Sequence, residues 1–386
     1  MAVGKRWESE KTDFRDAVTG VRMSRLTTYK CNHNHLYFTN PGWYDNGKKL
    51  IICGDRDNRT NLLSLDLDSY EIMQVTDLPE YPLPFEHCLH ISCVDGVRNV
   101  AYLVCGRDFL AVDLHTFETR KLWTLPDGYM KHVLSCSQDS DYLYTSIYED
   151  LSDLFPIDIE RGYIGFKEIF EHHPLSKIIR IRTDGSGAEP IWEEHNWIGH
   201  VNAAPHNADK ITFCHEGPWN LIDHRIWGMD VPSGKIWKIH PCDPDETIGH
   251  EYWYEDSEHI GYHGVRQDGR SYLGKISFDN TGKQEAAFTN ATGHIHSLDQ
   301  NLIVGDGGIR GSRFVSLWKW DGKEYIGPKA LCEHGSSSKT QREHVHPRIT
   351  PDVKSVLFTS DRSGYGSVYM AQIPEFESLP DLEDVL

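Results

Sequence analysis

This 386-residue chain lacks paired cysteine motifs, long apolar runs and any excess of positive charge. Its nine cysteines are odd in number and never spaced C-x-x-C, which argues against a disulfide framework and predicts free thiols in a reducing compartment. The first eight residues contain no apolar signal segment, and no later run approaches the length of a membrane span. We therefore expect a cytoplasmic protein.

Positive charge is scarce: 39 Lys and Arg face 58 Asp and Glu, which gives a net charge of −19. Such a surface repels nucleic acid and anionic membranes, so neither is an expected partner. An acidic substrate would also be repelled by the protein as a whole. A site for such a substrate therefore needs a local cluster of cations.

Helical periodicity is nearly absent as well. Short runs of β-branched and aromatic residues, bounded by Asp, Gly, Asn and Pro, recur along the chain; Lys48–Cys53, Asn61–Asp66 and Glu71–Val75 are examples. The runs group into sets of about 45 residues, a period typical of four-stranded propeller blades. The sequence predicts an all-β, seven-bladed β-propeller as a single domain over residues 1–375. Residues 150–173 are interpreted as an irregular, partly helical insertion with a short helix at 164–171, and residues 376–386 as a loosely packed acidic tail.

Histidines recur in register with these sets. His200, His250, His294 and His344 each directly precede the first strand of a set, at separations of 50, 44 and 50 residues (250−200, 294−250, 344−294). The first strand of a propeller blade lines the central channel, so these imidazoles should meet near the axis. We interpret them as a metal site; the alternative is that they cap hydrogen-bond networks in the channel.

The segment Gln341–Pro347, Q-R-E-H-V-H-P, strengthens the metal interpretation. His344 and His346 point the same way in an extended segment because side chains alternate with period 2. Gln341 lies an odd number of residues from both, so a bend is needed to bring its amide alongside them. Two imidazoles and a carboxamide are plausible ligands for a divalent metal. The alternative is a pair of solvated histidines on an edge strand.

Arg225 follows the polar loop of the segment Phe213–Trp227. A guanidinium at that place can bind a substrate carboxylate bidentately. It can equally pair with Asp223 or Glu216 as scaffolding. The residues alone leave both interpretations of Arg225, substrate binding and scaffolding, open.

Taken together, these motifs resemble the oligogalacturonate lyases, polysaccharide lyase family 22. The resemblance is carried by the following segments: Trp197–His200 (W-I-G-H), Phe213–Pro218 (F-C-H-E-G-P) with Asp223 and Arg225, Gly249–Trp253 (G-H-E-Y-W), Val304–Gly307 (V-G-D-G), Gln341 with His344–Pro347, and Val356–Asp361 (V-L-F-T-S-D). The resemblance implies a cytoplasmic seven-bladed propeller that uses Mn²⁺ to degrade short pectin fragments, mainly dimers.

The resemblance also implies roles for individual residues. Gln341, His344 and His346 become metal ligands, with His294 as the fourth; His296, two residues further, is the alternative. His250 becomes the general base and Arg225 the arginine that binds the substrate carboxylate. The remaining residues that it marks as substrate-binding are His200, His215, Lys177 and Arg180. The chain departs from the family at Thr292-Gly293-His294, where Cys-Ser-His is usual, and in the early blades, so the exact uronide stays open.

The implied chemistry is consistent with these residue types. β-Elimination from a 4-linked uronate removes the C5 proton, which is α to the C6 carboxylate, and a divalent metal on that carboxylate stabilises the developing charge. A neutral imidazole is a suitable base near neutral pH. Ligand type alone also admits zinc, iron or nickel. We therefore expect a carbon–oxygen lyase, monomeric or homodimeric, with a small acidic oligosaccharide as its partner. The rivals are a lyase for another uronic-acid disaccharide and a non-catalytic propeller that binds sugar or protein.

Overall fold

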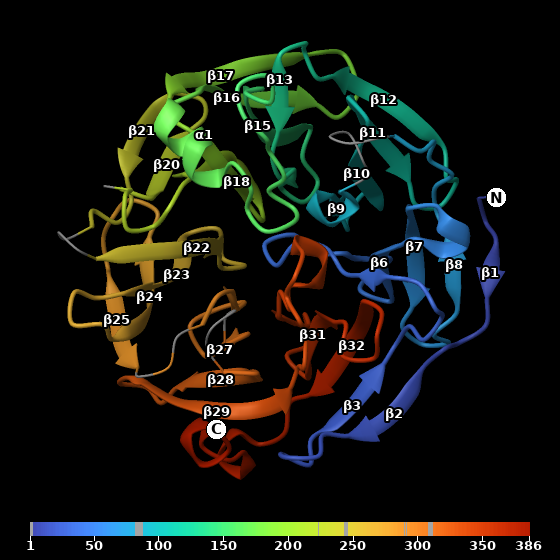
Figure 1. Cartoon of the computed structure of the whole chain (residues 1–386), viewed down its shortest axis with the longest axis vertical. Coiled ribbons are helices and arrows are strands. Elements are labelled where there is room, and N and C mark those ends of the chain that lie inside the picture. Colours follow the sequence, from blue (N-terminus) through green and yellow to red (C-terminus); the bar gives the residue numbers. More distant parts are fainter. Residues whose placement is uncertain are drawn as a thin grey trace.

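The computed structural model describes residues 3–81, 88–222, 224–242, 246–288, 290, 292–307 and 312–386. Their strands form seven antiparallel sheets that stand side by side in a ring around a central axis (Figure 1). Each sheet runs from an inner strand near the axis to an outer strand at the rim. The predicted all-β, seven-bladed β-propeller is confirmed.

The blades follow one another along the chain, and their strands are as follows. The first blade contains β1 (Arg6–Trp7), β4 (His33–Asn34), β5 (Trp43–Tyr44), β6 (Lys49–Gly54), β7 (Asn61–Asp66) and β8 (Ile72–Gln74). The second contains β9 (Cys93–Asp95), β10 (Val100–Cys105), β11 (Asp108–Asp113) and β12 (Thr119–Thr124). The third contains β13 (Tyr129–Lys131), β14 (Ser135–Cys136), β15 (Tyr142–Glu149), β16 (Leu175–Arg182) and β17 (Ala188–His195).

The remaining blades complete the ring. The fourth contains β18 (Ile198–Ala204), β19 (Asn207–His215), β20 (Ile226–Asp230) and β21 (Lys235–Lys238). The fifth contains β22 (Thr247–Trp253), β23 (His259–Val265), β24 (Ser271–Ser277) and β25 (Gln284–Phe288). The sixth contains β26 (Ile295–His296), β27 (Leu302–Gly305), β28 (Phe314–Trp320) and β29 (Tyr325–Glu333). The seventh contains β2 (Thr12–Arg15), β3 (Arg22–Arg25), β30 (Arg348–Ile349), β31 (Ser355–Ser360) and β32 (Ser367–Gln372).

The seventh blade closes the ring with strands from both ends of the chain. β3 pairs with β32, with Met23 opposite Ala371, and β2 adds the outermost strand. β1 pairs with β8 of the first blade. The sequence analysis does not predict these three short strands, because charged residues interrupt their apolar pattern.

The core lies between neighbouring blades. Ile51 and Leu62 of the first blade pack with Leu103 and Val112 of the second, and all four side chains are fully buried. Burying a side chain of this size contributes about 1.5–3 kcal/mol, so each blade is stabilised mainly by its neighbours. Similar clusters join the other blades. This stacking fixes the inner strands, which carry the site described below.

The C-terminal tail is ordered, so the expectation of a loosely packed segment is wrong. Residues 376–378 and 382–384 form single 3-10 turns, and Phe376, Leu379 and Leu382 are buried. The Ala330 N–H donates to the carbonyl of Pro380 at 3.0 Å, and Lys329 pairs with Asp381. The tail therefore covers the outer strand β29 of the sixth blade.

The insertion in the third blade contains α1 (Phe166–His172), close to the predicted helix 164–171. Besides the two turns of the tail, the described residues form 3-10 turns at 56–58, 89–91 and 341–343. No helix within the described ranges is both long and apolar enough to cross a membrane.

Candidate active site

Backbone bulges on the inner strands aim histidines into the channel. His200 in β18 and His250 in β22 have φ angles of 44° and 45°, and both strands shift register at these residues. His346 has the same left-handed φ of 45°. A positive φ is uncommon for a residue other than glycine, and a bulge re-aims the side chain it carries. The predicted convergence of histidines thus occurs, with His200 and His250 inside their strands and not before them.

Three buried histidines form a compact cluster. One ligand atom from each of His294, His344 and His346 lies within 4.8 Å of the others. Nδ1 of His344 and Nε2 of His346 are buried without a hydrogen-bond partner. Burial lowers the pKa of His344 to about 3, so its ring is neutral. Neutral imidazoles with unpaired buried nitrogens are the donors that a divalent metal requires.

Gln341 reaches the same cavity as this cluster. It begins a 3-10 turn, Gln341–Glu343, which supplies the bend that its odd spacing from the histidines demanded. Its side chain acts on the Tyr163 hydroxyl and opposes the rise that burial causes in the pKa of Tyr163, and both residues line the cavity with His294. The four predicted metal ligands therefore belong to one region of the channel.

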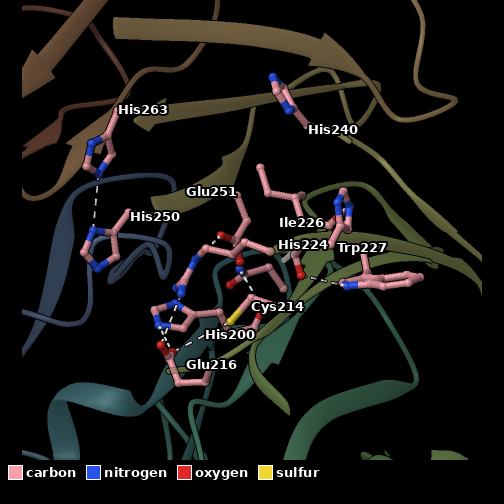
Figure 2. Close-up of polar contacts among 12 residues, drawn as sticks. His200, Cys214, Glu216, His224, Ile226, Trp227, His240, His250, Glu251 and His263 are labelled. Carbon is pink, nitrogen blue, oxygen red and sulfur yellow. Dashed lines mark hydrogen bonds and ion pairs between the residues drawn. The ribbon is translucent and has the colours of Figure 1, made fainter. Parts of the chain in front are cut away.

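His250 adjoins the cluster, with its ring centroid 4.4 Å from that of His294. Its Nδ1 hydrogen-bonds with the carbonyl of Gly293 and also lies 3.4 Å from Nε2 of His263 (Figure 2). A carbonyl can only accept, so Nδ1 carries the proton and Nε2 keeps the free lone pair. Burial, followed by the neighbouring His294, lowers the pKa of His250 well below its usual value.

Arg225 is held by two carboxylates. Its Nη1 donates to Oε1 of Glu216 at 3.1 Å, and its Nε lies 3.4 Å from Oε2 of Glu251. The second Glu216 oxygen lies 3.1 Å from Nε2 of His200 (Figure 2). Although burial opposes ionisation, Arg225 and His200 hold the pKa of Glu216 well below its usual range. The scaffolding alternative for Arg225 is thus present through Glu216; Asp223 lies outside the described residues.

These groups share a cavity of about 430 Å³ at one end of the channel. The insertion covers it: Ile157, Glu160 and Tyr163 line the cavity, and the Gln341 N–H donates to the Glu160 carbonyl at 3.2 Å. Trp219 packs on the other side, 5.3 Å from the ring of His250. The site is therefore a partly enclosed pocket with cationic and imidazole groups inside an acidic protein.

Three of the predicted substrate-binding residues lie away from this pocket. Lys177 and Arg180 are on β16, the third strand from the axis, and pair with Glu193 and Glu189 of β17. His215 hydrogen-bonds with Glu194 at 2.8 Å, and its ring packs 4.9 Å from that of Trp227. Strand alternation explains this, since Glu216 turns toward the cavity and His215 turns away. These three residues are therefore not part of the site proposed below, whereas His200 is.

His296 is also separated from the cluster. Its Nδ1 accepts the N–H of Ile349 at 3.3 Å, and its ring packs against Tyr252 in a second cavity. Within the described part of the chain, the histidine that joins His344 and His346 is His294.

Two further residues of the cavity, His132 and Tyr37, are not among those predicted from the sequence. His132 accepts the His200 N–H at 3.3 Å, and burial lowers its pKa to about 3. It precedes a strand as the recognised histidines do, so its position was a usable signal. Tyr37 packs 4.8 Å from His346 and lines the cavity, but nothing in its sequence context distinguishes it from a core tyrosine.

Comparison with known proteins gives consistent matches. The family model for oligogalacturonate lyase matches residues 1–312. The oligogalacturonate lyase of Dickeya dadantii (strain 3937) and the oligogalacturonide lyase of Pectobacterium atrosepticum are each 26% identical to this chain, over 97% of it and 99% of their own length. A solved oligogalacturonate lyase in complex with manganese superposes with a TM-score of 0.87 at 25% identity, covering 97% of this chain and 99% of that one. The chain is therefore a member of the oligogalacturonate lyase family.

Proposed function

We propose that this protein is a metal-dependent lyase that cleaves short galacturonides, mainly dimers, by β-elimination during pectin degradation. The observation that carries the proposal is the juxtaposition of a neutral, oriented His250 with the cluster of His294, His344 and His346 in one cavity. A base beside a site for a Lewis acid is what removal of a proton α to a carboxylate requires. Family membership supplies the substrate class.

The metal in this proposal is Mn²⁺, held by His294, His344, His346 and Gln341. The unpaired nitrogens of His344 and His346 fit such a group. Asp306 bonds to Nδ1 of His294 at 2.6 Å, the partner that a metal-bound imidazole usually has. When bound, the ion would neutralise the substrate carboxylate and stabilise the charge that develops on it. The solved relative with manganese supports this choice of metal.

His250 is the proposed general base. The Gly293 carbonyl holds Nδ1–H and leaves Nε2 to take the C5 proton of the uronate. Because its pKa is lowered, the ring is neutral at neutral pH, so Nε2 carries no proton before the reaction. The insertion over the cavity limits access of water. Water takes no part in breaking the bond in an elimination.

Arg225 is the proposed cation for the substrate carboxylate. Nη1 already donates to Glu216, and Nε lies 3.4 Å from Glu251 without a hydrogen bond, so the two carboxylates compete with a substrate carboxylate for both sides of the guanidinium. We therefore expect Arg225 to make one charge-assisted hydrogen bond to the substrate carboxylate, and not a bidentate pair. The two carboxylates fix the guanidinium in place, which lowers the entropy lost when substrate binds. His200, bonded to Glu216, is the adjoining substrate-binding group.

We also propose a cytoplasmic location, supported by the nine cysteines, which form no disulfide among the described residues. The net charge of −19 is consistent with a small substrate that enters a local cationic pocket, and not with nucleic acid or an anionic membrane as partner.

Incubation of the purified protein with digalacturonate tests the proposal. Elimination breaks the C4–O4 bond and gives one galacturonate and one 4,5-unsaturated uronate, which rearranges to a keto-deoxyuronate, whereas hydrolysis would give two molecules of galacturonate. We expect the keto product, detected by a chemical assay, in a Mn²⁺-dependent reaction. If the protein turns over a different uronic-acid disaccharide and not digalacturonate, that disaccharide becomes the assigned substrate. Metal binding without turnover of any uronide would favour a non-catalytic binding propeller.

A further inference from the structure

A second cavity, here called the lower cavity, continues the channel beyond the active site. It measures about 360 Å³, and its rim includes Val97, which is 60% exposed. On five inner segments, a residue of the active site or metal cluster is followed two positions later by a residue that lines the lower cavity. These pairs are Tyr37 and Thr39, His200 and Asn202, His250 and Tyr252, His294 and His296, and His346 and Arg348. Two residues of strand span roughly 6–7 Å, so the two cavities are successive chambers of one channel.

Arg348 gives the lower cavity an unpaired cation. Its side chain is only 5% exposed, and its Nη1 donates to the main-chain carbonyl of Phe38. Its Nε is buried without a hydrogen-bond partner. Among the described residues, no carboxylate forms an ion pair with Arg348 within 4 Å. The acid that acts on Arg348 is Glu255, which also lines the lower cavity but is itself paired with His206 at 3.5 Å. A buried cation without a counter-ion is unfavourable, and a bound anion would relieve that cost.

Two neighbouring polar groups add further recognition. Because His296 Nδ1 accepts the Ile349 N–H, the proton of its neutral ring is on Nε2, which is left as a donor. Asn202 donates from Nδ2 to the His200 carbonyl at 3.0 Å, while its Oδ1 is buried without a partner. A cation, a neutral donor and an acceptor together suit a molecule that carries both a carboxylate and hydroxyl groups.

The walls and size of the lower cavity fit one sugar ring. The ring centroid of Trp43 lies 5.8 Å from Cζ of Arg348. Tyr252 and Trp253 form further aromatic walls. A mostly apolar pocket with a few fixed polar groups, of this volume, is typical of small-molecule sites. We propose that the lower cavity binds a single sugar acid, with its carboxylate on Arg348 and its hydroxyl groups facing His296 and Asn202. This site is separate from the lyase site, and its existence does not depend on the proposed reaction.

Calorimetric titration with D-galacturonate as the probe tests this site. D-Galactose and acetate serve as the matched neutral sugar and the bare carboxylate. Each compound is titrated into the wild-type protein and into His344→Ala, which weakens the metal cluster and leaves the lower cavity intact. We expect galacturonate to bind both proteins, and Arg348→Gln to weaken that binding by about tenfold or more in both, a loss of about 1.4 kcal/mol. Arg270→Gln, on an exposed turn, is the control and should bind as wild type.

Arg348 also donates to the Phe38 carbonyl, so the folding of each variant is checked by circular dichroism, and that of the Arg348 variants with intact His344 also by metal content. Should Arg348→Gln fail to fold, two gentler changes replace it. Arg348→Lys keeps the positive charge but loses the planar guanidinium. His296→Asn keeps an acceptor for the Ile349 N–H but loses the Nε2 donor. Both should weaken galacturonate binding. The proposal is overturned if folded variants bind as wild type, if binding disappears in His344→Ala alone, or if galactose or acetate binds as tightly as galacturonate.

Discussion

Nδ1 of His294 lies 2.6 Å from Oδ2 of Asp306, whose other oxygen accepts the main-chain N–H groups of Gly293 and His294 at 2.9 Å. The carboxylate therefore fixes both the loop and the ring. Because an ionised carboxylate only accepts, the His294 proton is on Nδ1 and Nε2 is the nitrogen available to a metal. One side chain thus sets the tautomer of a proposed ligand.

Asp306→Asn should weaken metal binding by roughly 10–100-fold, the usual loss when such a partner is removed. Titration of the metal-free protein with Mn²⁺ measures the affinity. Asp256→Asn is the matched control, since Asp256 bonds to Nδ1 of His259 at 2.7 Å on an exposed turn away from the cavity. Equal Mn²⁺ affinity of the wild-type and Asp306→Asn proteins would show that Asp306 does not support a ligand.

His250→Gln should reduce turnover of digalacturonate by roughly 10²–10⁴-fold, because it removes the group that accepts the proton. The bound metal should remain, since His250 is not among the proposed ligands. Initial rates and metal content are measured on the same preparation. His259→Ala, which changes a half-buried histidine at the start of β23 and away from the cavity, should retain full activity. Near-normal turnover by His250→Gln would assign the base to another residue.

Much of the site was predictable because its signals are local. Histidines at blade spacing, and the pair His344 and His346, require only strand alternation and the knowledge that inner strands line a channel. The bulges at His200 and His250 were not predictable, since they depend on how each inner strand fits its neighbours. Their φ angles near 45° carry no clear mark in the sequence.

Errors arose where a position depended on partners distant in sequence. Lys177 and Arg180 were expected at the pocket, yet β17 supplies glutamates that hold them on the outer part of the blade. The closing strand β3 pairs with β32, more than three hundred positions away, and β2 pairs with β3, so their own short pattern was insufficient to predict them. The tail was misjudged because its acidic residues hid three buried apolar side chains.

Glu251→Ala should destabilise the fold, because it leaves the buried Arg225 with one counter-ion where it had two. Breaking a buried ion pair by removing one partner costs about 3–5 kcal/mol. Urea unfolding of the wild-type and mutant proteins measures this loss. Glu71→Ala removes the exposed partner of Arg6 and should change stability far less. Equal stability losses in the two variants would contradict the role assigned to Glu251.

Stability should fall as the pH drops below 6.5, and His33 should contribute to this fall. Burial, followed by the charge of Arg56, lowers the pKa of His33 to about 3, and Arg56 Nε donates to its Nε2 at 3.0 Å. Between pH 6.5 and about 3 the unfolded chain binds a proton that the folded protein does not. The contribution is therefore complete above 6.5 and is lost toward acid, at about 1.4 kcal/mol per pH unit.

His33→Gln tests this linkage, since its amide oxygen can still accept from Arg56. The free energy of unfolding should depend on pH less steeply in the mutant than in the wild type. The difference in slope should correspond to one proton fewer taken up on unfolding. Urea unfolding at a series of pH values gives both slopes. Parallel curves for the two proteins would mean that His33 does not titrate between the folded and unfolded states as described.

Removal and return of the metal tests the central claim most directly. The protein is treated with a chelator, and the initial rate of keto-deoxyuronate formation from digalacturonate is then followed as Mn²⁺ is added back, alongside His346→Ala. The account predicts that the chelated protein is inactive, that activity returns in proportion to the metal bound, and that His346→Ala neither binds Mn²⁺ tightly nor recovers. Full activity in the chelated protein, or in His346→Ala without bound metal, would contradict it.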